Sequence, residues 1–376
     1  MRTSHLIGVL TDNAGGFVRQ FLPSKSAVTL RAFAASTAFL TVPDSSPLMR
    51  DVIETDGARC QVWMTTLEGP HLTRRKLLEG RVKSPRGEAP FGTVTVPVVD
   101  DLALLDTLLG WQDPSAAITA QAVEYAVYTG PAETRVKAAV AANAARFGLP
   151  WDVVPTRGEG TDGRLELRMH KLSEKVLPIL QAERLVPSLV RQPTGRWLFD
   201  IVRPDALARP LTAMSGVLGS WSWVLDPDEA TDVVVGGRGE GTAREFLTVS
   251  DAARRTRVGY PLEVFVDAKQ TEEGADITPS GLDKLAETGA KAGFTAVLRE
   301  ASWFTFPDAY QEGTRVPVQV GGLDVDDVIS QIDITADPSS GLTVTPRIGL
   351  AVDDPQERLV GAVKRLAVAV GAAERR

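Results

Sequence analysis

The stretch VVVGGRGEGTAREF at positions 233–246 is the part of the sequence that most resembles a phosphate-binding loop. In the pattern G-x-x-x-x-G-K-[ST], backbone N–H groups surround the phosphates and the lysine contacts their outer oxygens. Gly236 and Gly241 have this spacing, but Thr242 stands at the lysine position. The loop therefore lacks the cation that this kind of nucleotide site requires.

A second phosphate-binding pattern, the dinucleotide fingerprint G-x-G-x-x-G, also fails. Gly237 and Gly239 are followed by Gly241, which is out of register. The next segment, REFLTVSD, is typical of a strand, so no helix N-terminus is available to hold an anion. We therefore predict a flexible hairpin loop at the edge of a barrel, where a neighbouring chain could sit. Its candidate interface residues are Gly236, Gly237, Arg238, Gly239, Glu240 and Gly241.

Metal and thiol chemistry find little support in the residue spacing. His5, His71 and His170 are far apart and lack the i, i+4 spacing of a zinc motif. Cys60 is the only cysteine, which excludes an internal disulfide and predicts a buried structural thiol. We predict no metal and no other cofactor.

The acidic run DVDDV, with Asp324, Asp326 and Asp327, invites a calcium interpretation. The EF-hand pattern would require a glycine at its sixth position and a glutamate at its twelfth, and both are missing. We predict an exposed turn instead. The G-x-S-x-G motif is also missing, whereas paired carboxylates for glycoside hydrolysis depend on a spatial separation that leaves this class open. The motifs favour a protein that is not an enzyme.

The composition fits a globular protein with more than one core. The chain has 376 residues, 43% of them hydrophobic, and a net charge of −7 from 41 basic and 48 acidic residues mixed along it. A nucleic-acid sleeve would show clustered Lys and Arg, so that class is disfavoured. Apolar runs of about 18 residues and a signal-peptide pattern are missing. We expect a mature chain from residue one, made in a cytoplasm and without membrane insertion of its own.

The character of the elements changes along the chain. Residues 1–105 and 193–250 contain many alternating strands, such as FGTVTVPVV, where Val94 and Val96 would face a core. Residues 106–192 have helical spacing and predict an inserted α/β domain. In its segment AETRVKAAVAANAARFG, one helix face would carry Val136, Val140, Ala144 and Phe147.

The last part of the chain predicts a further strand-rich domain and a terminal helix. Residues 251–350 would contain a helix at 279–298 among strands, and residues 351–376 read as an amphipathic helix. Asp354 and Glu357 form a capping pattern at its start. Its apolar stripe, a candidate partner contact, consists of Leu359, Val363, Leu366 and Val370.

Tryptophans in alternating strands are predicted to be core. RWLFDIV places Trp197 with Phe199 and Ile201 on one face, and SWSWVLD places Trp221 and Trp223 on one face. One alternative is that the three tryptophans stack on sugars in a carbohydrate-binding adhesion module. Another is an α/β enzyme, a hydrolase or a nucleotide-dependent transferase, built on the mixed segment.

The order of these elements, together with several short blocks, resembles a known family. The blocks are VVGGRGEG, EVFVDA, EGTRVPVQV, VISQIDITAD and GLTVTPRIG. They are similar to the minor tail proteins of long-tailed actinobacterial phages that form the baseplate hub at the tail tip, distantly similar to the hub of contractile-tailed phages. The resemblance runs over roughly residues 1–350. One departure is FPDAYQEGTRVPVQV, since such hubs usually carry a more regular Tyr- and Asp-rich approach to that strand.

The resemblance implies an α+β, β-rich fold with two tail-tube-like β-barrel domains around the α/β insert. It also implies a homotrimer in which three subunits make a ring of six barrels between a sixfold tail tube and a threefold tip. The expected partners are the distal tail protein, the C-terminus of the tape-measure protein and other minor tail or fibre proteins. Genomic DNA would pass through without specific binding. The expected location is the virion tail tip, after synthesis in the host cytoplasm.

Overall fold

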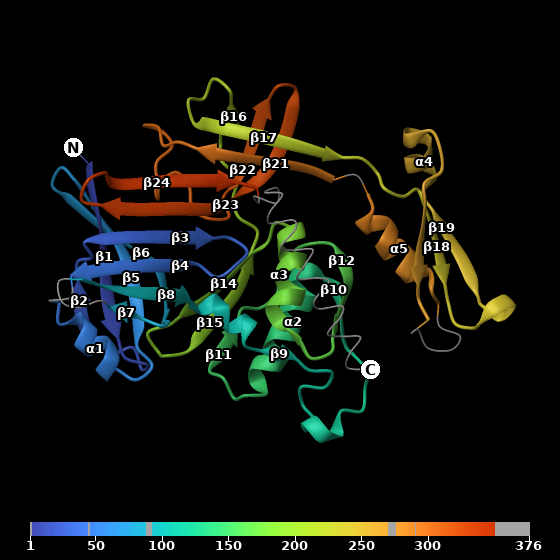
Figure 1. The fold of residues 1–376 in the computed structure, drawn as a ribbon, viewed down its shortest axis with the longest axis horizontal. Coiled ribbons are helices and arrows are strands. Elements are labelled where there is room, and N and C mark those ends of the chain that lie inside the picture. Colours follow the sequence, from blue (N-terminus) through green and yellow to red (C-terminus); the bar gives the residue numbers. More distant parts are fainter. Residues whose placement is uncertain (1, 44–45, 88–91, 270–275, 290, 350–376) are drawn as a thin grey trace. The chain divides into compact units, whose positions relative to one another are not determined.

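Strands are the predominant regular secondary structure of the described residues (Figure 1). The computed structural model describes residues 2–43, 46–87, 92–269, 276–289 and 291–349. The chain divides into two compact units: Met1–Ser220 with Ala296–Arg376, and Trp221–Thr295. The α+β, β-rich class expected from the sequence is confirmed.

The N-terminal strands form one half of the large sheet of the first unit, and neighbours in it are antiparallel. In β8 the valines Val94, Val96 and Val98 are buried and their neighbours are not, as the alternation predicted. A short helix, α1 (Leu48–Glu54), lies between β4 and β5. The strands are β1 (Arg2–Thr11), β2 (Phe17–Phe21), β3 (Lys25–Arg31), β4 (Thr37–Pro43), β5 (Arg59–Glu68), β6 (His71–Val82), β7 (Arg86–Gly87) and β8 (Thr93–Asp100).

The C-terminal strands extend the same sheet. β23 pairs antiparallel with β3, from Gln331 opposite Arg31 to Ala336 opposite Ser26, and Figure 1 shows these strands side by side. The two ends of the chain therefore share one hydrogen-bonded ladder. These strands are β16 (Leu211–Thr212), β17 (Leu218–Asp226), β21 (Lys291–Leu298), β22 (Arg315–Val320), β23 (Leu323–Asp337) and β24 (Gly341–Ile348).

The strand pairings of the described residues run in an open path. The order is β17-β21-β24-β23-β3-β4-β8-β6-β5-β1-β2, with β7, β16 and β22 attached beside it. Within these residues the pairings close no ring, so the two β-barrels that the resemblance implies are not seen as closed barrels. The path leaves β2 as an end strand.

The insert between β8 and β16 has its own core. Its buried residues extend from Leu102 to Ile201. They come from both helices and from the strands around them. The elements are η1 (Asp101–Asp106), β9 (Leu109–Gly110), η2 (Ile118–Ala120), β10 (Ala126–Pro131), α2 (Ala132–Ala145), β11 (Trp151–Val153), β12 (Asp162–Leu167), β13 (His170–Lys171), α3 (Leu172–Ala182), β14 (Val186–Arg191) and β15 (Trp197–Val202).

The predicted face of α2 is correct except at its end. Val136, Val140 and Ala144 are buried, but Phe147 is 57% exposed. The helix ends at Ala145, and Gly148 follows with a positive φ of 60°, so position 147 no longer continues the helical stripe.

The second unit is a small sheet with a helix on one face. Its strands are ordered β19-β18-β20, with β18 antiparallel to β19 and parallel to β20. The core consists of Val233, Val235, Ala268, Ile277 and Leu285. The elements are β18 (Asp232–Gly236), η3 (Gly241–Ala243), β19 (Phe246–Ser250), α4 (Ala252–Val258), β20 (Glu263–Asp267) and α5 (Thr278–Glu287).

Two local predictions near the C-terminal half are wrong. The predicted helix 279–298 ends at Glu287, and Lys291–Leu298 is strand β21. Its pairing, with Ala296 opposite Ile348, supplies long-range hydrogen bonds that override the local helical pattern. The run DVDDV is part of β23 rather than a turn, because it pairs with β22.

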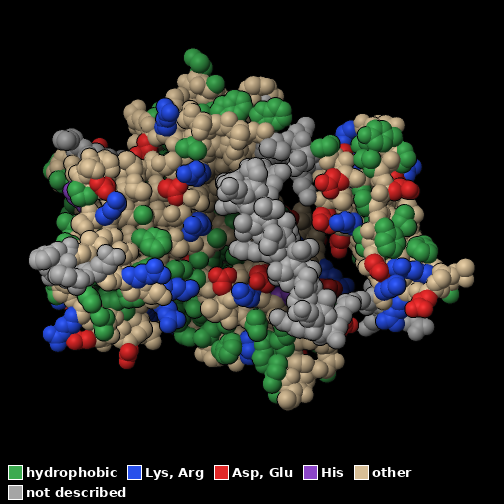
Figure 2. Space-filling model, viewed as in Figure 1, with side chains coloured by type: hydrophobic (Ala, Val, Ile, Leu, Met, Phe, Trp, Pro, Cys, Tyr) green, Lys and Arg blue, Asp and Glu red, His purple; other side chains and the backbone are tan. Residues whose placement is uncertain are grey.

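Charged side chains of both signs are interspersed on the face shown in Figure 2. This distribution agrees with the mixed charges of the sequence. None of the described helices is long and apolar enough to cross a membrane.

Candidate assembly surface

The glycine-rich loop is a hairpin connection between β18 and β19. The two strands are antiparallel, with Gly236 opposite Phe246. The Gly237 N–H donates to the Glu245 carbonyl at 2.9 Å, and the Glu245 N–H donates to the Arg238 carbonyl at 3.1 Å. A strand follows the loop, as predicted. The hairpin interpretation is confirmed.

The tip of this hairpin requires glycine and presents charge. Gly239 has φ 101°, and a Cβ there would lie 2.4 Å from the Ala243 carbonyl oxygen. Gly241 also has a positive φ, 56°. Arg238 and Glu240 are exposed, and neither forms an ion pair with the described residues. These are properties that a contact surface needs, but their role in assembly stays a prediction.

Arg244 crosses the base of the loop and binds both of its sides. Its guanidinium donates to the carbonyls of Gly236 and Gly237, each at 3.1 Å, and to Asp267 Oδ1 at 2.7 Å. A Cβ at Gly236 would lie 2.5 Å from Arg244 Nη2 and 2.7 Å from Phe265 Cζ. The glycine is therefore needed for space, because an arginine and an aromatic ring pass over it.

The open face of the small sheet is aromatic. The Arg244 guanidinium lies 5.5 Å from the ring centre of Phe246 and 5.3 Å from that of Phe265. These distances allow a cation–π attraction. The two rings are 57% and 52% exposed. Sequence reasoning missed this face, although the alternation of β19 and β20 was a signal for two side chains that point away from the core.

The opposite face of the sheet is covered by α5. A Cβ at Gly281 would lie 2.5 Å from Val249 Cγ2 and 2.8 Å from Val235 Cγ2. The small residue lets the helix approach the strands closely. Among the described residues of this unit, α5 covers this face, whereas Phe246 and Phe265 on the other face remain exposed.

A buried carboxylate holds α4 to the small sheet. Asp232 is 1% exposed and accepts hydrogen bonds from Ser250 Oγ and Thr231 Oγ1, each at 2.6 Å. Arg255 of α4 donates to the same carboxylate through a short ion pair. The hydrogen bonds from Ser250 and Thr231 lower the pKa of Asp232, so it remains an anion.

The prediction that Trp221 and Trp223 are core is wrong. They are 41% and 55% exposed. Trp221 stacks at 6.3 Å on Phe294, which is buried. Alternation shows that two side chains share a face, but it does not show which face is covered. The predicted burial of Phe199 and Ile201 is confirmed.

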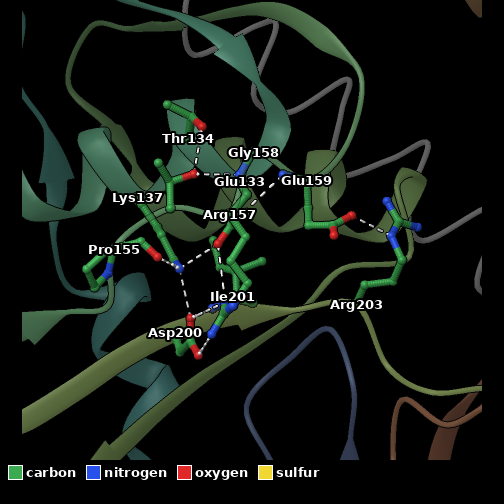
Figure 3. Close-up of polar contacts among 11 residues, drawn as sticks. Glu133, Thr134, Lys137, Pro155, Arg157, Gly158, Glu159, Asp200, Ile201 and Arg203 are labelled. Carbon is green, nitrogen blue, oxygen red and sulfur yellow. Dashed lines mark hydrogen bonds and ion pairs between the residues drawn. The ribbon is translucent and has the colours of Figure 1, made fainter.

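The insert contains a network of charged side chains from α2, from the loop between β11 and β12, and from β15 (Figure 3). Lys137 Nζ lies 2.6 Å from Glu133 Oε1 and 2.8 Å from Asp200 Oδ1. Arg157 Nη2 lies 2.8 Å from Asp200 Oδ2, and Arg157 Nη1 lies 3.3 Å from Glu133 Oε1. Each charge is therefore matched by two opposite charges, and the network stabilises the insert.

Hydrogen bonds keep both acids of this network ionised. Burial acts to raise the pKa of Asp200, but the bonds from Arg157 and Lys137 outweigh it and lower the pKa to about 2. Burial opposes ionisation of Glu133 in the same way. Its pKa is nevertheless lowered by Lys137 and by the backbone N–H groups of Glu159 and Arg157.

A second buried cluster joins the insert to the first sheet. Asp101 Oδ2 accepts hydrogen bonds from Arg59 at 2.6 Å and from Trp197 Nε1 at 2.9 Å. The Trp197 ring centre lies 6.0 Å from the Arg59 guanidinium and 5.3 Å from that of Arg191. Trp197 thus lies close to two arginines from different strands.

The residues considered for metal or thiol chemistry are separated in the fold. His5 lies in β1, His71 in β6 and His170 in β13. In the described ranges, no group of three or more His, Cys, Asp or Glu side chains could hold a metal ion. Cys60 is buried, and burial raises the pKa of its thiol to about 12. The predicted apolar stripe Leu359, Val363, Leu366 and Val370 lies outside the described residues.

Comparison with known proteins adds a family and a fold. Residues 45–350 match the family model described as Siphovirus ReqiPepy6 Gp37-like protein. No curated protein matches the chain.

Three solved structures are similar along nearly their whole length. A 43 kDa tail protein of prophage MuSo2 from Shewanella oneidensis is 12% identical, with a TM-score of 0.53, covering 92% of this chain and 98% of that one. A tail protein from Neisseria meningitidis MC58 is 13% identical, with a TM-score of 0.50 and coverage of 93% and 97%. The prophage tail protein gp18 from Listeria monocytogenes EGD-e is 10% identical, with a TM-score of 0.50 and coverage of 96% and 99%.

The family model spans most of the chain, whereas the low identities to the solved structures show a shared fold alone. Both findings agree with the resemblance to phage tail proteins drawn from the sequence, which is confirmed. This chain belongs to the Siphovirus ReqiPepy6 Gp37-like proteins and has the fold of phage tail proteins.

Proposed function

We propose that this protein is a structural subunit of a siphophage tail tip, the baseplate hub. Three copies form a ring that joins the sixfold tail tube and the distal tail protein to the threefold tip. The main support is the similarity in fold to the 43 kDa tail protein of prophage MuSo2. The matched region covers 92% of this chain and 98% of that protein. Such agreement leaves little of the chain for an unrelated activity.

The open strand path supports assembly into a closed ring. β2 is an end strand, and Phe17 at its start and Leu22, the residue after its end, are 70% and 68% exposed. An uncovered strand edge with apolar side chains is a site of unwanted pairing unless another chain covers it. Cyclic symmetry covers every such edge and prevents open-ended polymerisation.

In this role the ring surrounds the C-terminus of the tape-measure protein and carries other minor tail or fibre proteins. Its lumen is the exit channel for DNA. The interspersed charges and the net charge of −7 suit a wall along which a polyanion slides, since strong binding requires clustered Lys and Arg.

Mass photometry of the purified chain and imaging of the tail tip test this proposal. We expect particles of three times the 40.3 kDa subunit mass and a threefold ring in images of native tails. A stable monomer in solution, together with tail tips that lack the protein, would refute the hub role.

A carbohydrate-binding function is a second candidate, and the exposure of Trp221 and Trp223 favours it. Exposed tryptophan rings are suited to stacking on sugars. A glycan array probed with the wild-type chain and with a Trp221→Ala, Trp223→Ala double variant tests this function. Binding that the double variant loses would support it, and an array without signal would exclude it for the glycans present.

A further inference from the structure

A groove lies at the junction between the first sheet and the insert, inside the larger unit. Its volume is about 720 Å³. Most of its apolar lining comes from the insert and includes Leu104, Phe147, Leu149, Trp151 and Trp197, and β8 adds Val99. Phe147 is the most open of these, with 57% of its surface exposed.

Trp151 forms part of one wall of this groove. The residue is 8% exposed, and its buried Nε1 has no hydrogen-bond partner among the described residues. This nitrogen has almost no exposed surface, so a ligand in the groove meets the indole ring rather than the N–H. The indole N–H of Trp197, which also lines the groove, donates to Asp101 at 2.9 Å.

The rim of the groove also carries two basic side chains that form no ion pair with the described residues. Arg81 and Lys83 are exposed, and neither forms an ion pair within the described part of the chain. The two acids of the lining, Asp100 and Asp101, already accept hydrogen bonds from protein donors. Among the described residues, the groove therefore offers a ligand two unpaired cations beside an apolar surface.

We propose that this groove binds a peptide segment of a partner tail protein in which an apolar side chain stands next to carboxylates. The apolar side chain removes Phe147 and its neighbours from water, and the carboxylates meet Arg81 and Lys83. The segment also packs beside the Trp151 ring, which lines the groove. Tryptophan is enriched where proteins bind one another. The proposal does not depend on the ring, because the groove is formed within one chain.

The test uses three fluorescein-labelled peptides and the full-length protein. The probes are Gly-Leu-Phe-Asp-Asp-Gly and the same peptide with Asn-Asn or Lys-Lys in place of Asp-Asp. We expect fluorescence anisotropy to show binding of the acidic peptide that is about tenfold tighter than that of the Asn peptide, and no binding of the Lys peptide. Equal affinity for the three peptides, or no binding of the acidic one at about 1 mM, would overturn the proposal.

Variants separate the groove from general electrostatics. Arg81→Glu and Lys83→Glu should each weaken the acidic peptide about tenfold. Arg74→Glu is the matched control, since Arg74 is also exposed and without an ion pair, lies on β6 like Arg81, and is outside the groove lining. If Arg74→Glu weakens binding equally, the site is not the groove. If the glutamate variants fail to fold, Arg81→Gln and Lys83→Gln serve in their place.

A direct readout of the indole completes the test. The Trp151 Nε1–H resonance in a ¹⁵N–¹H spectrum, assigned with Trp151→Phe, should shift on saturation with the acidic peptide, while that of Trp63 stays in place. Trp63 is a suitable reference because its N–H already donates to Gln61 at 3.0 Å. An unmoved Trp151 resonance would overturn the proposal, and so would a groove occupied by a second copy of this chain in the assembled protein.

Discussion

The Trp197 indole donates to the Asp101 carboxylate across 2.9 Å, and this bond connects β15 with η1, the first element of the insert. The same oxygen accepts from Arg59 at 2.6 Å, and both Asp101 and Arg59 are buried. A buried carboxylate is stable only with such donors. The orientation of the insert on the sheet therefore depends on one shared anion.

Replacing Trp197 tests this junction. Trp197→Phe keeps an aromatic ring but removes the N–H, so Asp101 loses one of its two donors. We expect the free energy of unfolding to fall by about 1–3 kcal/mol, measured by denaturant titration. Trp63→Phe is the control, because the partner lost there is the neutral side chain of Gln61 and its cost should be smaller. Equal losses in the two variants would contradict the role of Asp101.

The network around Asp200 predicts a pH-dependent contribution to stability. Its pKa in the folded protein is about 2, below the ordinary 3.8, so the contribution is present above about pH 4 and is lost as the pH falls through 2. We expect Asp200→Asn to lower the free energy of unfolding by about 2 kcal/mol at pH 7. The difference from wild type should shrink as unfolding is measured at pH values from 4 towards 2.

An exposed aspartate provides the control for that measurement. Asp152 pairs with Arg196 at 2.6 Å, but both side chains are about half exposed. Exposed surface pairs contribute little to stability, so Asp152→Asn should change the free energy of unfolding little at any pH. A pH-independent loss in Asp200→Asn would show that packing rather than charge carries its effect.

A side chain at position 236 should clash with Arg244 and Phe265 and destabilise the fold. In Gly236→Ala the new Cβ would lie 2.5 Å from Arg244 Nη2, so the guanidinium must leave its place beside Phe265. We expect a loss of about 1–3 kcal/mol in thermal or chemical unfolding. Gly237→Ala is the control at the neighbouring position. Its new Cβ would lie 3.3 Å from Ile277 Cδ1, the end of a flexible side chain, and this is its shortest contact. Similar losses at both positions would contradict the steric explanation.

The hairpin tip tests assembly separately from folding. Arg238 and Glu240 are exposed and have no ion pair with the described residues, so an Arg238→Ala, Glu240→Ala variant should unfold at the wild-type temperature. If the tip is a subunit contact, the fraction of trimer in mass photometry should fall. A normal trimer fraction would remove these two residues from the interface.

Cys60 should be unreactive in the folded protein. It is fully buried, and its pKa of about 12 leaves almost no thiolate near neutral pH. We expect no reaction with Ellman's reagent in buffer at pH 8 and one reactive thiol per chain in denaturant. A thiol that reacts in buffer would show that the core around β5 opens.

The sequence by itself determined the local elements. Alternating valines predicted β8, and spacing around Val136 and Val140 predicted the buried face of α2. The position of Thr242 and the strand after it identified the glycine-rich loop as a hairpin. These features depend on side chains within a few residues of one another, so a short stretch contains all the information they need.

Only the tertiary structure decided how these elements combine. Residues 291–298 look helical locally but form a strand, because Ala296 finds a partner at Ile348. The ladder between β3 and β23 joins residues about 300 positions apart, and the charged network brings Asp200 to Lys137. The exposure of Trp221 and the unmatched indole of Trp151 likewise depend on which elements cover each face. Strand pairing and burial are long-range properties, and no local pattern specifies them.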